Sequence, residues 1–196
     1  MLFRSRGVTA AAFCLVLLVL ACGLRADAAD ETVTVDAGVL HLTVPKTWQS
    51  EKVTNRFRRA QFKVPKAKGD SEDADFVVYD FAGGGGGVDP NIQRWVRSFQ
   101  PNGRKAKVVT GKSPQGEYVL ADLEGTWNKP IGPMVEQRTQ EMPNARVLSV
   151  ILTTKEGNYF LKLTGPKATV GANVDAFRAS FGGDAKTEKT RPIAQE

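Results

Sequence analysis

Few residues in this chain have the types and the spacing that acid–base chemistry requires. Asp122 and Glu124 are two positions apart in an alternating segment, so in a strand they share one face, like the paired carboxylates of a glycosidase. Asp80 lies in another strand-like segment, and His41 is the only histidine. No G-x-S-x-G motif supplies a nucleophile. Charged residues on the solvent face of an antiparallel strand give the same pattern, so we expect no catalytic residue.

A metal site has too few ligands. Cys14 and Cys22 are the only cysteines, and both lie in the apolar N-terminal segment. With a single histidine in the chain, a zinc, copper or iron site of nitrogen and sulfur ligands is excluded. Acidic residues crowd the loop 70–75, but without the spacing and the glycine of a calcium-binding EF-hand. We therefore expect neither a metal nor a cofactor.

A run of glycines, Gly83 to Gly87, precedes a predicted helix. Free amides at a helix N-terminus attract anions, which makes a phosphate-binding loop one interpretation. The run lacks the G-K-[ST] ending of such loops, and Asp89, the predicted N-cap residue, places negative charge there. A flexible connection between a strand and the helix explains the run with fewer assumptions.

The densest basic stretch of the chain runs from Arg56 to Lys66. Arg59 and Lys63 are four positions apart, so they are predicted to project from one face of a strand. They form a candidate surface for an acidic partner. A solvated strand face is the simpler interpretation.

The secondary structure predicted around these residues consists mostly of strands. Only two helices are predicted, one that begins at Asp89 and ends before Pro101, and one over 170–181. Because two helices cannot alternate with many strands, the fold class is α+β, with an antiparallel β-sheet flanked by helices. Alternating or apolar runs predict the strands at 32–35, 39–45, 57–64, 76–81, 105–111, 117–127, 146–153 and 158–164.

Residues 1–28 are predicted to be a secretory signal peptide. Arg4 and Arg6 precede the apolar run Val8–Leu24, and Ala26–Ala28 provides a small-residue cleavage site. Two alternatives stay open. In the first, a lipobox ends in Cys22, which is then lipidated and attaches the chain to a membrane. In the second, the segment is an uncleaved anchor, although it is short for a membrane span.

The remainder is predicted to be a single α+β domain over 29–182, followed by a disordered tail over 183–196. The first 28 residues carry three arginines against one aspartate, a net +2, which leaves +4 of the chain's +6. In an exported protein this mild excess suits an acidic envelope component better than nucleic acid. No aromatic platform for stacked bases is recognisable, so we expect no nucleic-acid partner.

Two passages resemble known proteins. Residues 86–95 (GGVDPNIQRW) resemble the G-G-x-V-x-x-N-I-x-R-W segment of a group of exported bacterial proteins of unknown function, and residues 157–166 resemble their hairpin before the last helix. Val44 and Pro45 followed by Trp48 resemble the P-x-x-W strand end of PsbP-like proteins, the extrinsic photosystem II subunits. The likeness spans residues 33–181 and rests on these short motifs.

The resemblance implies an α-β-α sandwich that works by binding and not by catalysis. It transfers no catalytic residue, and it places a functional surface at Asn91, Arg94 and Trp95. The structural alternative is that Trp95 belongs to the core while Asn91 and Arg94 brace the glycine loop.

We therefore expect an exported, non-catalytic binding or accessory module for an envelope protein or an anionic envelope component. One alternative is an envelope-polymer hydrolase that uses Asp80, Asp122 or Glu124. Another is a structural lipoprotein that is tethered through Cys22.

Overall fold

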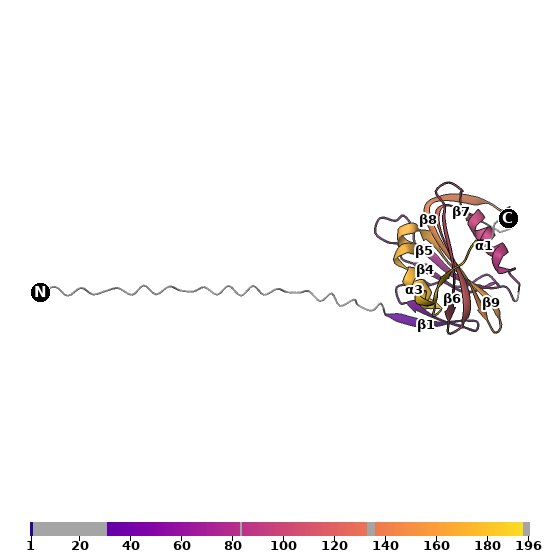
Figure 1. The fold of residues 1–196 in the computed structure, drawn as a ribbon, viewed down its shortest axis with the longest axis horizontal. Coiled ribbons are helices and arrows are strands. Elements are labelled where there is room, and N and C mark those ends of the chain that lie inside the picture. The colour runs from indigo at the N-terminus through magenta and orange to yellow at the C-terminus, as the bar shows by residue number, and fades with distance from the viewer. Residues whose placement is uncertain (2–30, 83, 133–135, 194–196) are drawn as a thin grey trace.

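The computed structural model describes residues 1, 31–82, 84–132 and 136–193. The predicted cleavage site and Cys22 lie outside these residues, so the signal peptide stays a prediction. The described part consists mostly of antiparallel strands with a few helices (Figure 1), which confirms the α+β class. No helix among the described residues has both the length and the apolarity to cross a membrane.

Most strands form one sheet. Its members are β3 (Gln49–Ser50), β4 (Arg58–Val64), β5 (Ala74–Asp80), β6 (Lys105–Ser113), β7 (Gly116–Pro130), β8 (Thr139–Thr154), β9 (Gly157–Pro166) and β10 (Lys189–Thr190). This 8-stranded sheet has the order β10-β6-β7-β8-β9-β5-β4-β3, and its neighbouring strands are antiparallel. The apolar strand expected near 76–81 is β5, which lies inside the sheet between β9 and β4.

The first two strands form a separate hairpin. β1 (Thr32–Ala37) pairs with β2 (Leu40–Pro45) in a two-stranded antiparallel sheet. Gly38 has φ +72° in the connecting turn, a conformation that side chains other than glycine rarely adopt. The strands predicted at 32–35 and 39–45 are thus present, and the buried leucines of β2 attach the hairpin to the domain by its apolar face.

The helices differ from their predicted bounds. α1 (Val88–Arg97) has Gly87 as its N-cap, so Asp89 lies in the first turn and not at the cap. The single helix expected over 170–181 is divided into α2 (Lys167–Ala172) and α3 (Val174–Ser180). The break falls at Asn173, whose side chain donates to the carbonyl oxygen of Thr169 and accepts from Trp48 Nε1 at 3.2 Å. Asn173 therefore binds the last turn of α2 through Thr169 and also fixes the indole of Trp48.

Two apolar clusters lie on the two faces of the large sheet, because successive side chains of a strand point to opposite faces. Leu161 and Leu163 of β9 pack in one cluster with Val170, Phe177 and the leucines of β2. We call this side the α3 face. Phe160 packs in the other cluster with Ile92, Trp95 and Phe99, and we call this side the α1 face.

The tail expected to be disordered is ordered as far as residue 193. After the short 3₁₀ helix η2 (Ala185–Thr187), β10 pairs with the edge strand β6. Glu188 accepts hydrogen bonds from Arg178 Nε at 2.7 Å and from the Tyr118 hydroxyl at 3.1 Å. The tail is polar in sequence, yet these mostly buried partners and the free edge of β6 hold it in place, which corrects the prediction for 183–193.

Candidate functional site

Asn91 holds the glycine segment before α1. The Asn91 side chain is 2 % exposed, and its Nδ2 donates to the carbonyl oxygens of Gly85 at 2.7 Å and Gly87 at 2.8 Å. Its Oδ1 accepts a hydrogen bond from Arg94. Gly85 and Gly86 have positive φ angles of +95° and +80°. Of the two roles expected for Asn91, bracing the glycine loop therefore agrees with its contacts.

Trp95 lies in the core below α1, next to a residue that the sequence analysis did not single out. Trp95 is 4 % exposed and belongs to the cluster on the α1 face. The Nζ atom of Lys162 lies 5.2 Å from the centroid of the Trp95 ring, close enough for a cation–π contact. A usable clue was present in the sequence, because Lys162 is the only charged residue in the apolar run 159–163.

Among the described residues, no acidic side chain pairs with Lys162. Burial and, to a smaller extent, the positive charge of Arg94 lower the pKa of Lys162 to about 8. Arg94 is exposed, and Lys162 is half-buried. In the part of the chain that the structure describes, neither of the two cations forms an ion pair.

Three buried polar atoms have no hydrogen-bond partner among the described residues: Arg58 Nε, Trp95 Nε1 and Ser149 Oγ. Ser149 is 0 % exposed and lies directly opposite Lys162 in the β8–β9 pair. Arg58 lies opposite Tyr79, which packs against the cluster of the α1 face. All three atoms are therefore on the α1 face, and all three can donate. We refer to Lys162, Arg94, Trp95 and Ser149 as the Lys162 site.

Arg59 and Lys63, predicted to share one strand face, are separated. A β-bulge between Arg58 and Ala60 shifts the register of β4, which reverses the alternation at this point. Lys63 pairs with Asp75 at 2.7 Å, and Arg59 pairs with Asp80 at 2.6 Å. Asp75 and Asp80 are five positions apart in β5 and so point to opposite faces. The expected common basic surface is not formed.

The strand carboxylates are paired with cations as well. Asp122 accepts two hydrogen bonds from Arg146, at 2.9 and 2.7 Å, and Glu124 forms an ion pair with Lys167 at 2.7 Å. The hydrogen bond from Lys167 holds the pKa of Glu124 below its ordinary value. Arg59 similarly lowers the pKa of Asp80. The lowered pKa values keep Glu124 and Asp80 ionised at neutral pH, whereas a general acid needs a raised pKa.

His41 and the acidic loop 70–75 have local partners. The exposed His41 lies opposite Asp36 in the β1–β2 hairpin, with 2.7 Å between His41 Nδ1 and Asp36 Oδ1. Asp70 accepts from the backbone N–H of Thr169 at 2.8 Å and so ties the loop to α2. The described residues contain no group of three or more histidine, cysteine, aspartate or glutamate side chains that could hold a metal ion.

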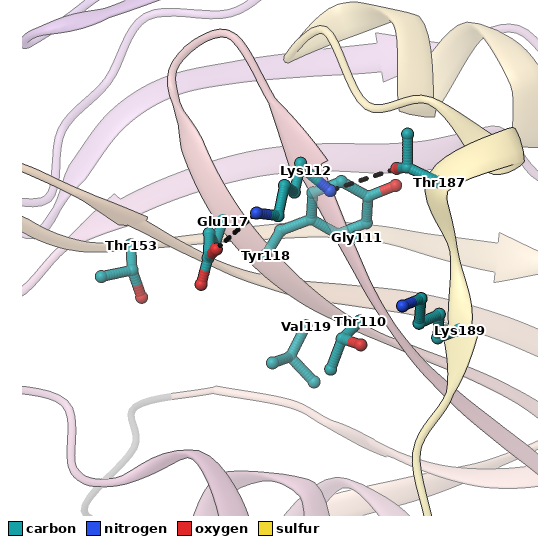
Figure 2. A pocket seen from close by; sticks show the side chains of 9 residues that line it. All are labelled: Thr110, Gly111, Lys112, Glu117, Tyr118, Val119, Thr153, Thr187 and Lys189. Carbon is teal, nitrogen blue, oxygen red and sulfur yellow. Dashed lines mark hydrogen bonds and ion pairs between the residues drawn. The ribbon is translucent and has the colours of Figure 1, made fainter.

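A surface cavity of about 280 Å³ lies at the end of the sheet where β6 turns into β7. Figure 2 shows Lys112 and Glu117 on the two strands of this hairpin, with Thr187 and Lys189 approaching from the tail. Lys112 and Glu117 are 3.2 Å apart, and each side chain is 76 % exposed. No sequence pattern pointed to these residues. Because its central charges satisfy each other in solvent, this cavity is a weaker candidate than the Lys162 site.

Comparisons with known proteins give structural matches only. No family model matches the chain, and neither does any curated protein. A solved protein of unknown function from Pseudomonas aeruginosa is similar, with 16 % sequence identity over 76 % of this chain and 92 % of that chain, at a TM-score of 0.40. The cyanobacterial PsbP (CyanoP) of Synechocystis is similar with 8 % identity over 82 % of this chain and 92 % of that chain, at a TM-score of 0.45. Neither match assigns a function to this chain.

Proposed function

We propose that this chain is an exported, non-catalytic binding or accessory module, built as a PsbP-like α-β-α sandwich, whose ligand contacts the Lys162 site. One observation supports this function above all others. The two cations of the site, Lys162 and Arg94, have no anionic partner among the described residues, although the carboxylates singled out as catalytic candidates are paired with cations.

An unpaired, half-buried cation lowers the stability of a folded domain, because burial removes part of its hydration. An apolar side chain at position 162 would continue the apolar sequence of Leu161 and Leu163 and would pack against the Trp95 ring. Residues that reduce stability are common where a function requires them. The charge of Lys162 therefore favours a role in binding.

The alternative of an envelope-polymer hydrolase has less support. Asp122 and Glu124 do share one face of β7, as expected, but Arg146 and Lys167 occupy their oxygens. Asp80 is likewise bound by Arg59. These ion pairs leave none of the three carboxylates free to act as a base, and the lowered pKa values of Asp80 and Glu124 do not suit a general acid at neutral pH.

The proposed place of action is the cell envelope, because the first 28 residues have the pattern of a signal peptide. The proposed partner is an envelope protein or an anionic envelope component, and not a nucleic acid. Lipidation at Cys22, which lies outside the described residues, would attach the module to a membrane.

A comparative capture experiment tests the proposed function. The full chain is used as bait on a solubilised native envelope, and the captured components are quantified by mass spectrometry for wild type, Arg94→Ala and Arg138→Ala. Arg138 is a matched control, because it is an exposed arginine paired with Glu136. Each component that depends on Arg94 is then purified and its affinity for the full chain is measured.

A component that binds wild type and Arg138→Ala, but binds Arg94→Ala more weakly, supports the proposal. Equal capture by all three chains, or no capture at low salt, contradicts it. Polymer turnover that is lost in a folded Glu124→Gln variant would establish the hydrolase instead.

A further inference from the structure

The cations of the Lys162 site are held together by groups other than carboxylates. Arg94 is fixed by its hydrogen bond to Asn91, which is itself bound to the carbonyl oxygens of Gly85 and Gly87. Lys162 lies over the Trp95 ring. Burial lowers the pKa of Lys162, and the charge of Arg94, which α1 and the glycine segment hold within electrostatic range of β9, lowers it as well.

An acidic residue on the same face of the sheet as Lys162 already forms an ion pair with another lysine. Asp75 lies opposite Thr164, two positions from Lys162 on the same face of β9. Its carboxylate pairs with Lys63 at 2.7 Å. The acidic residue of α1, Asp89, forms an ion pair with Arg191 of the tail at 2.9 Å. The counter-charge of Lys162 and Arg94 is therefore not supplied by these two residues.

The neutral polar groups of the site, like its two cations, favour a ligand with negatively charged acceptor atoms. Ser149 Oγ and Trp95 Nε1 are buried, lack partners among the described residues and can each donate a hydrogen bond. Lysine and arginine side chains donate and cannot accept. A site of donors around two positive charges is complementary to oxygen acceptors with negative charge, and it disfavours cations and neutral apolar molecules.

We infer that the Lys162 site binds one oxyanion, a phosphate or carboxylate group, between Lys162 Nζ and the Arg94 guanidinium. This inference rests on the proposed binding function and names the chemistry of its ligand. Lysine acts as a point charge toward such a group, whereas arginine presents a planar fork that matches two of its oxygens. The oxyanion converts the repulsion between the two cations into attraction to a shared anion.

The test uses the full chain and two direct measurements. Inorganic phosphate and acetate are titrated at constant ionic strength, with chloride as the reference salt, and thermal unfolding is followed. In parallel, the pKa of Lys162 is measured by NMR of its ¹³Cε resonance. The expected results are a saturable rise in Tm with phosphate or acetate and an upward shift of the Lys162 pKa from about 8.

Three variants locate the effect. Lys162→Met and Arg94→Gln are each expected to weaken binding of the oxyanion about tenfold or more, which is the loss of one charge-assisted contact. Lys46→Met is the matched control. It removes the same charge from an exposed lysine that pairs with Glu31, and it is expected to leave the affinity unchanged.

A further arm identifies the source of the oxyanion. Vesicles of phosphatidylcholine with and without phosphatidylglycerol are compared for wild type and Lys162→Met, which share the same N-terminal segment. Binding of phosphate or acetate in solution supports a soluble oxyanion. Binding only to phosphatidylglycerol vesicles, with loss in Lys162→Met, supports a lipid phosphate.

The inference is overturned if neither the free anions nor the vesicles shift the Lys162 pKa, or if Lys46→Met and Lys162→Met lose the same amount of binding. That outcome leaves the proposed binding function standing, because an envelope protein can be captured through Arg94 without placing an oxyanion against Lys162. Conversely, if the capture experiment fails but phosphate binds clearly, the proposed envelope partner is contradicted and the oxyanion site is supported.

Discussion

The amine of Lys162 lies over the indole ring of Trp95, with 5.2 Å between Nζ and the ring centroid. The two residues come from β9 and α1, which are far apart in the chain. The ring contact offsets part of the cost of burying the amine, since a cation near an aromatic face is attracted by the ring quadrupole. The pKa of Lys162 is nevertheless lowered to about 8, mainly through burial, so the offset is incomplete.

We expect Lys162→Met to stabilise the domain at neutral pH. Methionine keeps the length of the side chain and its contact with Trp95, and it removes a charge that is half-buried without an ion pair. The free energy of unfolding should rise by about 0.5–2 kcal/mol, a common gain when a residue kept for function is replaced. Urea unfolding of the full chain measures the change. A loss of stability would indicate that Lys162 is a structural residue.

The same lysine predicts how stability depends on pH. The folded-state pKa of about 8 is below the ordinary value of 10.5, so in this window the unfolded chain binds more protons than the folded chain. The destabilising effect is complete below pH 8, and it is relieved as the pH rises toward 10.5. The charged groups facing this position are Arg94 on α1 and, across the sheet, the ion pair of Lys63 with Asp75.

Urea unfolding of wild type and Lys162→Met between pH 7 and 10 tests this dependence, because all other titrating groups are common to the two proteins. Wild type should gain stability above pH 8 relative to Lys162→Met. Parallel curves for the two proteins would show that the pKa of Lys162 is not lowered.

Asn91→Ala should loosen the start of α1. The substitution removes the donor for the carbonyl oxygens of Gly85 and Gly87 and the acceptor for Arg94. Each lost hydrogen bond costs about 1 kcal/mol. Amide hydrogen exchange in the first turns of α1 should become faster, whereas Gln93→Ala, on the same helix, should change it little. Unaltered exchange in Asn91→Ala would mean that the glycine segment is held by other contacts.

Glu188→Ala should release the tail from the domain. Arg178 would lose a partner that it contacts through Nε at 2.7 Å, and the side chains of Arg178 and Glu188 are only 13 % and 8 % exposed. Breaking a buried ion pair costs about 3 kcal/mol, which should appear in urea unfolding. Glu156→Ala, in the exposed β8–β9 turn, is the control.

A second measurement on the tail uses Tyr118. Burial raises the pKa of Tyr118 to about 12, and the charge of Glu188 contributes to the increase. Glu188→Gln removes that charge and keeps a side chain of similar size. The Tyr118 pKa should therefore fall, as followed by ultraviolet absorbance. A pKa that stays at its wild-type value would show that Glu188 does not lie beside the phenol.

Local patterns in the sequence were sufficient to predict most strands and the fold class. β2 is buried on one face only, which imposes an apolar residue at every second position. β5 has buried residues on both faces, which requires a continuous apolar run. The spacing of apolar residues likewise predicted a helix at α1, and the burial of Trp95 agrees with the alternative that it belongs to the core. The count of histidines and cysteines led to the expectation that a transition-metal site of nitrogen and sulfur ligands is absent, because such sites require particular ligand types in sufficient number.

Only the tertiary structure decided which charged residues have partners. The bulge in β4 sends Arg59 and Lys63 to different faces, and the edge of β6 orders a tail whose own composition is polar. Lys162 and Trp95 meet because β9 passes beneath α1, a contact between segments with no sequence pattern in common. Periodicity reports which face of an element is buried, whereas the pairing of charges depends on distances between elements, and folding alone sets those distances.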